Sequence, residues 1–417
     1  MICRWIIIAS LMLIAAIPSL AQNRLIAYVQ DGEVFLLGPN GSVQVTRTEQ
    51  EYKYIADMRW SPDGSRLAFT QYIEEIGSDG YPFYRTDLFV IDPSNLTPGS
   101  LTAVGEDISA GFPPAWAEDG TLYFVRDNPN NMSAMSPEDF MMDIFRVTNN
   151  GVRAVASVPF GAGCGGGTSE PHYMLYNTEA GFGGNAITFL ATRYGLLMSL
   201  NCGGGGLQLV GFDGTITRLD DVLARVALAA DGRTLAALAL DYSSFPPLTT
   251  LYLYDLETRT LRQTSTSKLV DQVGWGGDGA LYYSSSVPSG ELFTAEEATL
   301  IGEAQGYDTS FMIPAPIPYY RVTVNRIDLV SGSEMEVAAH DASFVGRLRP
   351  VAGGVAYSVI GSLEAWGRGL IDGSIDPMSE AYYNNLTNYV SLESFIFQSA
   401  NDRSVSLGRL AQMEIAP

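Results

Sequence analysis

The apolar residues of this chain fall in many short runs in which apolar and polar positions alternate, separated by turns rich in glycine and aspartate. Alternation with a period of two predicts half-buried β-strands. The clearest example is residues 60–69 (WSPDGSRLAF), where a strand ending in tryptophan is followed by an Asp-Gly turn and a second alternating strand. In such a turn aspartate accepts amide hydrogens, and glycine takes the positive φ that reverses the chain.

The same unit recurs along the chain, with good copies at 116–124 and 275–283, a copy at 228–235 in which leucine replaces the tryptophan, and weaker ones around 192–195 and 352–357. Two further strands follow each turn, so each unit is a four-stranded meander, with strands a, b, c and d. One meander cannot bury both of its faces, and radial stacking of such units gives a propeller. We assign a structural role in the repeat to Trp60, Asp63, Gly64, Trp116, Asp119, Gly120, Asp231, Gly232, Trp275, Asp278 and Gly279.

The predicted fold is therefore all-β, a single β-propeller of four-stranded blades. Six a-type strands end near Trp60, Trp116, Ala191, Leu228, Trp275 and Pro350. Three earlier strands, at 25–29, 34–37 and 43–46, lack an a strand of their own. If residues 404–416 supply it, seven blades close the ring without an exposed edge. Six blades are the alternative.

The stretch Trp-Ser-Pro-Asp-Gly-x-x-Leu-Ala-Phe at residues 60–69 resembles the WD-like repeats of TolB-type propellers, and the copies at Trp116 and Trp275 are similar to it. The resemblance covers the repeat skeleton of most of the chain and implies the fold rather than an activity. TolB-type proteins also carry a small α/β domain before the propeller. Here we expect a signal peptide to be cleaved after Ala21, and only residues 22–24 then precede the first strand.

The N-terminal residues have the pattern of a secretory signal peptide. One charge, at Arg4, precedes an apolar run from Ile6 to Ile17 and small residues ending at Ala21. The run is shorter than the roughly twenty residues that cross a bilayer. We expect residues 1–21 to be cleaved, residues 22–417 to form the propeller domain without a membrane span, and the protein to be secreted or periplasmic. An uncleaved anchor is the alternative.

Acidic residues dominate the charge, with 46 Asp and Glu against 24 Lys and Arg and a net charge of −22. Loss of Arg4 with the signal peptide changes this to 23 − 46 = −23. Such a surface repels phosphate backbones and anionic lipids, so we expect no nucleic acid and no polyanionic sugar as partner. The acidity itself is typical of solubility outside the cell.

Extra residues fall mostly between strands b and c, at 73–86, 127–141, 241–249, 286–319 and 361–388. In a meander the b–c and d–a connections emerge on the same side, which predicts one decorated face, and such a face often binds the ligand of a repeat protein. The candidate binding residues are aromatic: Tyr81, Tyr84, Tyr319, Tyr320, Trp366, Tyr382 and Tyr383. The alternative is that they pack against their own loops.

Two cysteines remain after cleavage, Cys164 and Cys202, each within a glycine-rich tract. In an exported chain they predict a disulfide, which the repeat register places on the decorated face. Closing a loop of about 38 residues would stabilise the fold by roughly 3 to 4 kcal/mol. A metal site is the alternative, but two thiols without a nearby histidine make a poor zinc shell. We expect no metal and no cofactor.

Catalytic groups are scarce. The chain has two histidines, His172 and His340, in different repeats, and no G-x-S-x-G nucleophile elbow. Lyases that act on acidic sugars need clustered histidines and basic groups, which this sequence lacks. The acidic clusters at 127–143 and 372–380 do not have calcium-loop spacing, although calcium in a loop stays an alternative to a solvated surface.

The sequence therefore favours an exported, non-catalytic binding or scaffolding module that recognises a protein or glycan through its decorated face. An enzyme, hydrolase or lyase, with a site in the central channel or in the insertions is the main alternative. A structural surface component is the third. An enzyme would show a compact polar cluster with a base, whereas a binding module would show a broad aromatic patch.

Overall fold

The structure is a computed structural model of the 417-residue chain. It describes residues 24–47, 55–76, 82–95, 101, 103–109, 112–133, 140–160, 188–199, 206–241, 248–306, 309, 314–342, 344–377, 379 and 392–417. Within these ranges, no helix combines the length and the apolar character that a membrane crossing requires.

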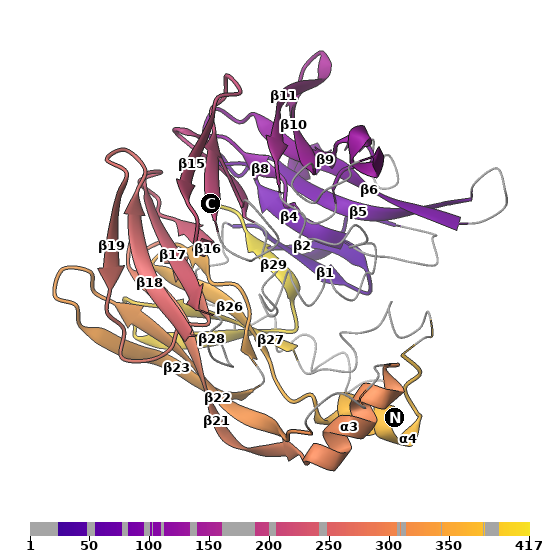
Figure 1. The fold of residues 1–417 in the computed structure, drawn as a ribbon, viewed down its shortest axis with the longest axis vertical. Coiled ribbons are helices and arrows are strands. Elements are labelled where there is room, and N and C mark those ends of the chain that lie inside the picture. The colour runs from indigo at the N-terminus through magenta and orange to yellow at the C-terminus, as the bar shows by residue number, and fades with distance from the viewer. Residues whose placement is uncertain are drawn as a thin grey trace.

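Seven antiparallel sheets form the blades of a β-propeller (Figure 1). Blade 1 comprises β29 (Ala411–Ile415), β1 (Ile26–Gln30), β2 (Glu33–Gly38) and β3 (Gly41–Gln44). Blade 2 comprises β4 (Ile55–Trp60), β5 (Leu67–Ile76), β6 (Pro82–Ile91) and β7 (Ala103–Gly105). Blade 3 comprises β8 (Ala115–Trp116), β9 (Leu122–Asp127), β10 (Met141–Thr148) and β11 (Gly151–Pro159).

Blade 4 comprises β12 (Phe189–Thr192), β13 (Gly195–Ser199), β14 (Leu207–Val210) and β15 (Ile216–Asp220). Blade 5 comprises β16 (Leu223–Leu228), β17 (Thr234–Asp241), β18 (Leu248–Asp255) and β19 (Thr260–Thr264). Blade 6 comprises β20 (Gln272–Trp275), β21 (Leu281–Phe293), β22 (Ile317–Ile327) and β23 (Glu334–Ala342). In blade 7, β24 (Phe344–Val345) and β25 (Arg349–Val351) both pair with β26 (Gly354–Ile360), which is followed by β27 (Leu392–Gln398) and β28 (Arg403–Gly408).

The ring closes where the last strand, β29, pairs with the first described strand, β1. β29 pairs antiparallel with β1 through Ile26↔Ile415 and Ala27↔Glu414, and it also contacts the innermost strands β25 and β4 on either side. The prediction of seven blades closed by a C-terminal strand is confirmed. Within the expected segment the closing strand is Ala411–Ile415, while residues 404–408 belong to β28 of blade 7. The predicted ends of the six other innermost strands agree with the structure to within one residue.

The Asp-Gly turns connect strands a and b. Asp63 Oδ1 accepts the amide hydrogen of Ser65 at 3.0 Å, and hydrogen bonds from Ser61 and Ser65 lower the pKa of Asp63 to about 2. In the other copies Asp119, Asp231 and Asp278 accept the amide two residues ahead, at 2.9, 2.8 and 3.2 Å. The glycines that follow the four aspartates all have positive φ, namely Gly64 at 69°, Gly120 at 78°, Gly232 at 65° and Gly279 at 77°.

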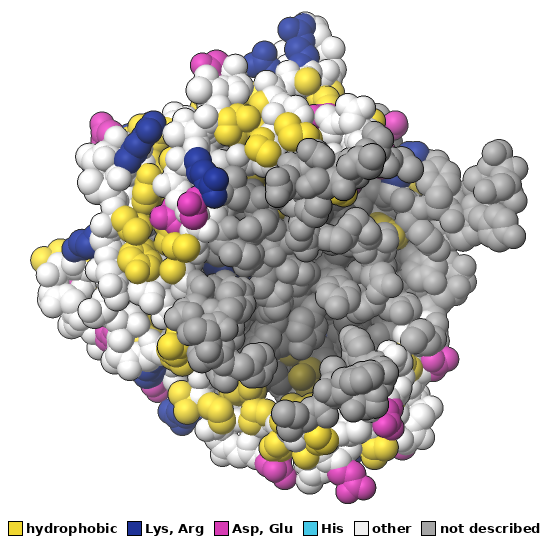
Figure 2. All heavy atoms as spheres, in the orientation of Figure 1, with side chains coloured by type: hydrophobic (Ala, Val, Ile, Leu, Met, Phe, Trp, Pro, Cys, Tyr) yellow, Lys and Arg dark blue, Asp and Glu magenta, His cyan; other side chains and the backbone are white. Residues whose placement is uncertain are grey.

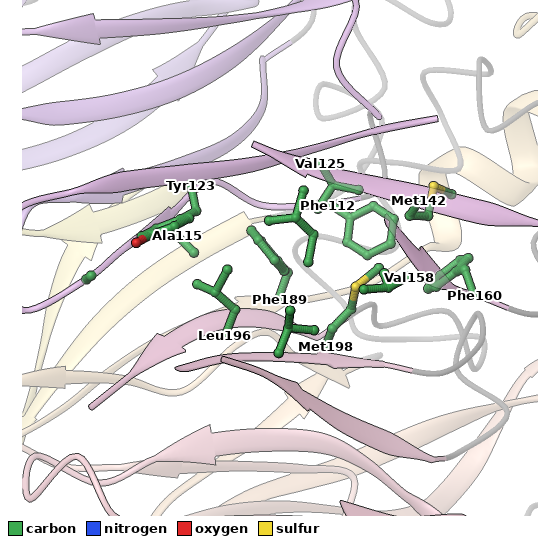
Figure 3. Close-up of a cluster of buried hydrophobic side chains, with 13 residues drawn as sticks. Phe112, Ala115, Tyr123, Val125, Met142, Val158, Phe160, Phe189, Leu196 and Met198 are labelled. Atoms are coloured by element: carbon green, nitrogen blue, oxygen red, sulfur yellow. The ribbon is translucent and has the colours of Figure 1, made fainter. Parts of the chain in front are cut away.

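Hydrophobic cores lie between neighbouring blades. In the core between blades 3 and 4, the ring centroid of Phe112 lies 5.0 Å from that of Phe160 and 6.1 Å from that of Phe189. Side chains from both blades converge on these rings (Figure 3), among them Tyr123, Val125, Met142, Val158, Leu196 and Met198. Each blade thus buries its faces against its neighbours, as the meander pattern requires.

Candidate functional site

Two b–c hairpins extend beyond the blades. β5 and β6 stay paired from Leu67↔Ile91 to Ile76↔Pro82, and β21 and β22 stay paired from Leu281↔Ile327 to Phe293↔Ile317. Parts of the segments at 73–86 and 286–319, expected to be loops, are therefore strand, because β5, β6, β21 and β22 continue into them, and α3 (Ala295–Ala304) lies within the second segment. Both b–c hairpins leave their blades on the decorated side, and in Figure 1 the β5–β6 hairpin extends to the upper right.

Helices from two insertions form a compact unit on this side. α3 (Ala295–Ala304) follows β21, and α4 (Glu364–Asp372) follows β26. The two helices contact each other and share one buried core, which comprises Leu292, Phe293, Ile301, Leu370 and Ile375. We call α3, α4 and these core residues the helical cap, which lies at the lower right of Figure 1.

The start of α3 is fixed by a capping box. The Thr294 hydroxyl oxygen accepts the Glu297 amide hydrogen at 3.2 Å, and Glu297 Oε2 accepts the Thr294 amide hydrogen at 2.9 Å. Two amide hydrogens at the helix start are thereby satisfied. Neither helix was expected from the sequence, although Thr294 and Glu297 have the spacing of this motif.

The two helices fit closely because of Gly367. A Cβ at this position would lie 2.3 Å from Phe293 Cζ, so only glycine lets α4 approach so near. The Arg368 guanidinium lies 5.1 Å from the centroid of the Phe293 ring and pairs with Glu297 of α3. Insertions of blades 6 and 7 thus act as one body rather than as two separate loops.

Three of the predicted aromatic residues have described side chains. Tyr319 and Trp366 are half-buried and pack against the core of the helical cap, and Tyr319 Oη donates to Glu364 at 3.2 Å. Tyr320 packs against the core between blades 6 and 7. Tyr84 belongs to β6, but its side chain lies outside the described residues, as do Tyr81, Tyr382 and Tyr383. Tyr319 and Trp366 therefore pack the insertions, Tyr320 packs between two blades, and all three stay half-buried.

The exposed surface of the cap mixes apolar and acidic groups. Leu300 of α3 is 42% exposed, and Val287 of β21 is 55% exposed. Figure 2 shows hydrophobic side chains next to acidic ones along the lower edge of the molecule, around the helical cap. Such a mixed surface on a rigid element suits contact with another macromolecule.

A polar cluster between blades 5 and 6 was missed from the sequence. Arg225 Nη1 donates to the Asp271 carbonyl at 2.9 Å, and the Ser286 hydroxyl donates to the Asp271 carboxylate. Burial raises the pKa of Asp271 to about 6, against the opposing effects of Ser286 and Arg225. Arg225 has φ of +46° at a register shift in β16, a strained position that directs its side chain toward blade 6. No spacing signal marks the pair, because it joins two different repeats.

The remaining candidate groups do not assemble into a catalytic set within the described residues. His340 Nε2 lies 3.3 Å from Tyr357 Oη, its ring centroid is 4.7 Å from that of Phe395, and burial lowers its pKa. His172, Cys164, Cys202 and residues 1–21, predicted to be a signal peptide, lie outside the described residues. In the part of the chain that is described, no three His, Cys, Asp or Glu residues gather to hold a metal ion.

No protein-family model and no curated protein sequence matches the chain. Similar solved structures are β-propellers. They include an oligogalacturonate lyase from Vibrio parahaemolyticus (10% identity over 81% of this chain and 85% of that chain, TM-score 0.50). The propeller domain of the Trilobed protease from Pyrococcus furiosus also matches (11% identity over 91% and 90%, TM-score 0.49). At such identities the likeness shows the propeller fold, without placing the chain in the TolB-type family.

Proposed function

We propose that this chain is an exported, non-catalytic binding module that holds a protein or saccharide ligand against its decorated face. The observation that carries the proposal is the helical cap. Because insertions of blades 6 and 7 share one hydrophobic core, they offer a preformed surface that loses little conformational entropy on binding. The side chains on this face are of the kinds that recognise other molecules: exposed aliphatic groups, half-buried aromatic rings and carboxylates.

The proposal includes the parts that rest on sequence alone. Residues 1–21 direct export and are then removed, Cys164 and Cys202 form a disulfide, and the strongly acidic chain avoids nucleic acid. The Trp-Ser-Pro-Asp-Gly repeat relates the chain to TolB-type propellers. Exposed Leu300 and Val287 favour a protein ligand over a saccharide, because aliphatic groups contribute to protein interfaces through burial.

Substitutions of two leucines with similar exposure test whether the decorated face binds the ligand. The mature chain is screened on peptide and glycan arrays, and each ligand found is measured again with Leu300→Glu and Leu261→Glu. Leu300 on the cap and Leu261 on β19 are 42% and 43% exposed, so the two changes introduce the same charge at sites of similar exposure, and thermal melts verify that both variants fold. Loss of binding in Leu300→Glu alone supports the proposal. Equal binding by both variants contradicts it.

An enzyme remains the second candidate because of Asp271. A carboxyl with a pKa of about 6 beside Arg225 and Ser286 can transfer a proton near neutral pH. This candidate predicts turnover of a substrate that Asp271→Asn abolishes while binding to the decorated face is kept. A turnover that the variant retains would exclude Asp271 as its acid or base.

A further inference from the structure

Five charged residues form a chain across the innermost strands of blades 7, 1 and 2. Glu414 Oε1 on β29 accepts hydrogen bonds from Arg349 Nε at 2.9 Å and from Arg59 Nη1 at 2.8 Å. Arg59 Nη1 also lies 2.8 Å from Asp57 Oδ1, and Arg347 Nη1 lies 3.4 Å from the same oxygen. The order is therefore Arg349, Glu414, Arg59, Asp57, Arg347, with signs that alternate and a cation at each end.

Four of these residues have a structural role in closing the ring. Arg349, Arg59, Glu414 and Asp57 join the closing strand to both neighbouring blades, and their charges balance, at 2 − 2 = 0. Arg347 is the fifth member and, counted over the described residues, brings the cluster to 3 − 2 = +1 in a chain whose net charge is −22. Within the described part of the chain Arg347 pairs with Asp57 at 3.4 Å, and Arg59 contacts the same carboxylate oxygen at the shorter distance of 2.8 Å.

The position of Arg347 places its side chain along the central channel. Leu348, the next residue, is buried and packs closely against Gly274 of blade 6. A Cβ added to Gly274 would lie only 2.5 Å from the Cβ of Leu348. Arg347 instead extends from blade 7 past the closing strand to Asp57 of blade 2. A side chain that joins these innermost strands runs along the wall of the channel that they line.

Arg347 is both poorly neutralised and reachable. A quarter of its side-chain surface, 25%, is accessible, while burial of the rest lowers the pKa of its guanidinium. A charge withdrawn from water without a full counter-charge is costly, and a bound anion removes that cost. The guanidinium fork matches the planar carboxylate, and a single negative charge matches the single excess positive charge.

We infer that Arg347 is the anchor of a binding site in the central channel for a ligand bearing one carboxylate, seated between Arg347 and the end of the charge chain at Asp57 and Arg59. The carboxylate belongs either to a free small acid, such as a sugar acid, or to the carboxyl terminus of a peptide. This site uses no residue of the helical cap, and its test does not depend on the function proposed above.

Calorimetric titration of the full chain tests the site with two matched probe pairs. Glucuronate is compared with glucose, and trialanine with its C-terminal amide, at constant ionic strength because salt screens the interaction. We expect one or both carboxylates to bind at concentrations of about 1 mM or below, and the neutral probes not to bind. The pair that binds identifies the source of the carboxylate.

Variants assign the binding to Arg347. Arg347→Gln is expected to weaken binding about tenfold or more, and Arg347→Lys, which keeps the charge but not the fork, less. Arg321→Gln is the control, because Arg321 also has a long ion pair, 3.3 Å to Glu336, but on β22 away from the innermost strands. Thermal melts of all variants verify folding. Failure of both carboxylates to bind, or unchanged affinity in a folded Arg347→Gln, overturns the inference.

Discussion

The indole Nε1–H of Trp116 donates to the main-chain carbonyl of Arg59 at 3.0 Å and so joins the innermost strands of blades 3 and 2. The same bond recurs from Trp60 to the carbonyl of Glu414 at 3.2 Å, and from Trp275 to that of Ala227 at 3.0 Å. In every case the acceptor belongs to the preceding blade. The repeated tryptophan therefore forms a hydrogen bond between neighbouring blades, which explains its recurrence at one position of the repeat.

Substitution of one of these tryptophans is expected to destabilise the ring. Trp275→Phe keeps an aromatic ring in the core but leaves the Ala227 carbonyl without its donor, which costs about 1 to 3 kcal/mol together with the lost contact area. Urea unfolding followed by far-UV circular dichroism measures the change. A midpoint equal to that of the unaltered protein would show that the indole bond contributes nothing.

The repeats could be predicted because their turns are made from neighbouring residues. Asp63 and Gly64 form their turn locally, so the sequence shows it directly. Blade 4 was a weaker match because its a–b turn is shorter: Thr192 of β12 pairs directly with Gly195 of β13, whereas Trp60 pairs with Leu67. The Thr192 hydroxyl accepts the Tyr194 amide hydrogen at 3.1 Å and donates to the Gly195 carbonyl at 2.9 Å, so a different turn without aspartate connects these strands.

The candidate sites could not be predicted in the same way. The Arg347–Asp57 contact joins residues 290 positions apart, and it exists only because β29 closes the ring between their blades. Asp271 is not part of an acidic cluster in the sequence, and its raised pKa comes from burial between two blades. The helical cap is an intermediate case, since the capping box of Thr294 was visible but its packing partner lies in another blade.

The ion pairs of Glu414 are expected to stabilise ring closure. Glu414 is 15% exposed and pairs with Arg349 and Arg59, so Glu414→Gln removes the negative charge that joins the two arginines across the closing strand, which costs about 2 to 4 kcal/mol. Asp221→Asn is the control, because its pair with Arg218 is 67% exposed on both sides and contributes less than about 1 kcal/mol. Differential scanning calorimetry compares the two. Equal losses would mean that Glu414 is not a closure residue.

Asp271 is expected to make stability fall as the pH rises. Its folded pKa of about 6 lies above the ordinary 3.8, so the native state favours the protonated form. The contribution is fully present below pH 3.8 and is lost as the pH rises through about 6. Asp271→Asn cannot ionise, so its stability relative to the unaltered protein should rise by about 2 to 3 kcal/mol between acidic and neutral pH.

Urea midpoints across this pH range measure the Asp271 effect. Asp213→Asn is the control of opposite sign, because hydrogen bonds from Thr215 lower the pKa of Asp213. That carboxylate stabilises the fold above its unfolded pKa and loses this effect as the pH falls. If the Asp271→Asn difference does not grow with pH, the carboxyl is not buried as described.

His340 is expected to make the folded protein less stable as the pH becomes acidic. Burial against Tyr357 and Phe395 lowers its pKa below 6.5, so the native state favours the neutral imidazole. As the pH falls through 6.5 the unfolded chain takes up the proton first, and stability is lost. His340→Phe should remove this loss, which is measured as a smaller fall of the urea midpoint between about pH 8 and pH 5. An unchanged fall would contradict the burial of the ring.

The helical cap should loosen without unfolding the blades. Gly367→Ala places a Cβ 2.3 Å from Phe293 Cζ, so α4 must move away from the core that it shares with α3. Gly290→Ala is the control, because its added Cβ would meet nothing nearer than Tyr319 Cδ2 at 4.0 Å. Hydrogen exchange should accelerate in α3 and α4 of Gly367→Ala and stay unchanged in the blades. If exchange accelerates in α4 alone, the two insertions do not act as one body, and the preformed surface proposed for ligand binding is lost with it.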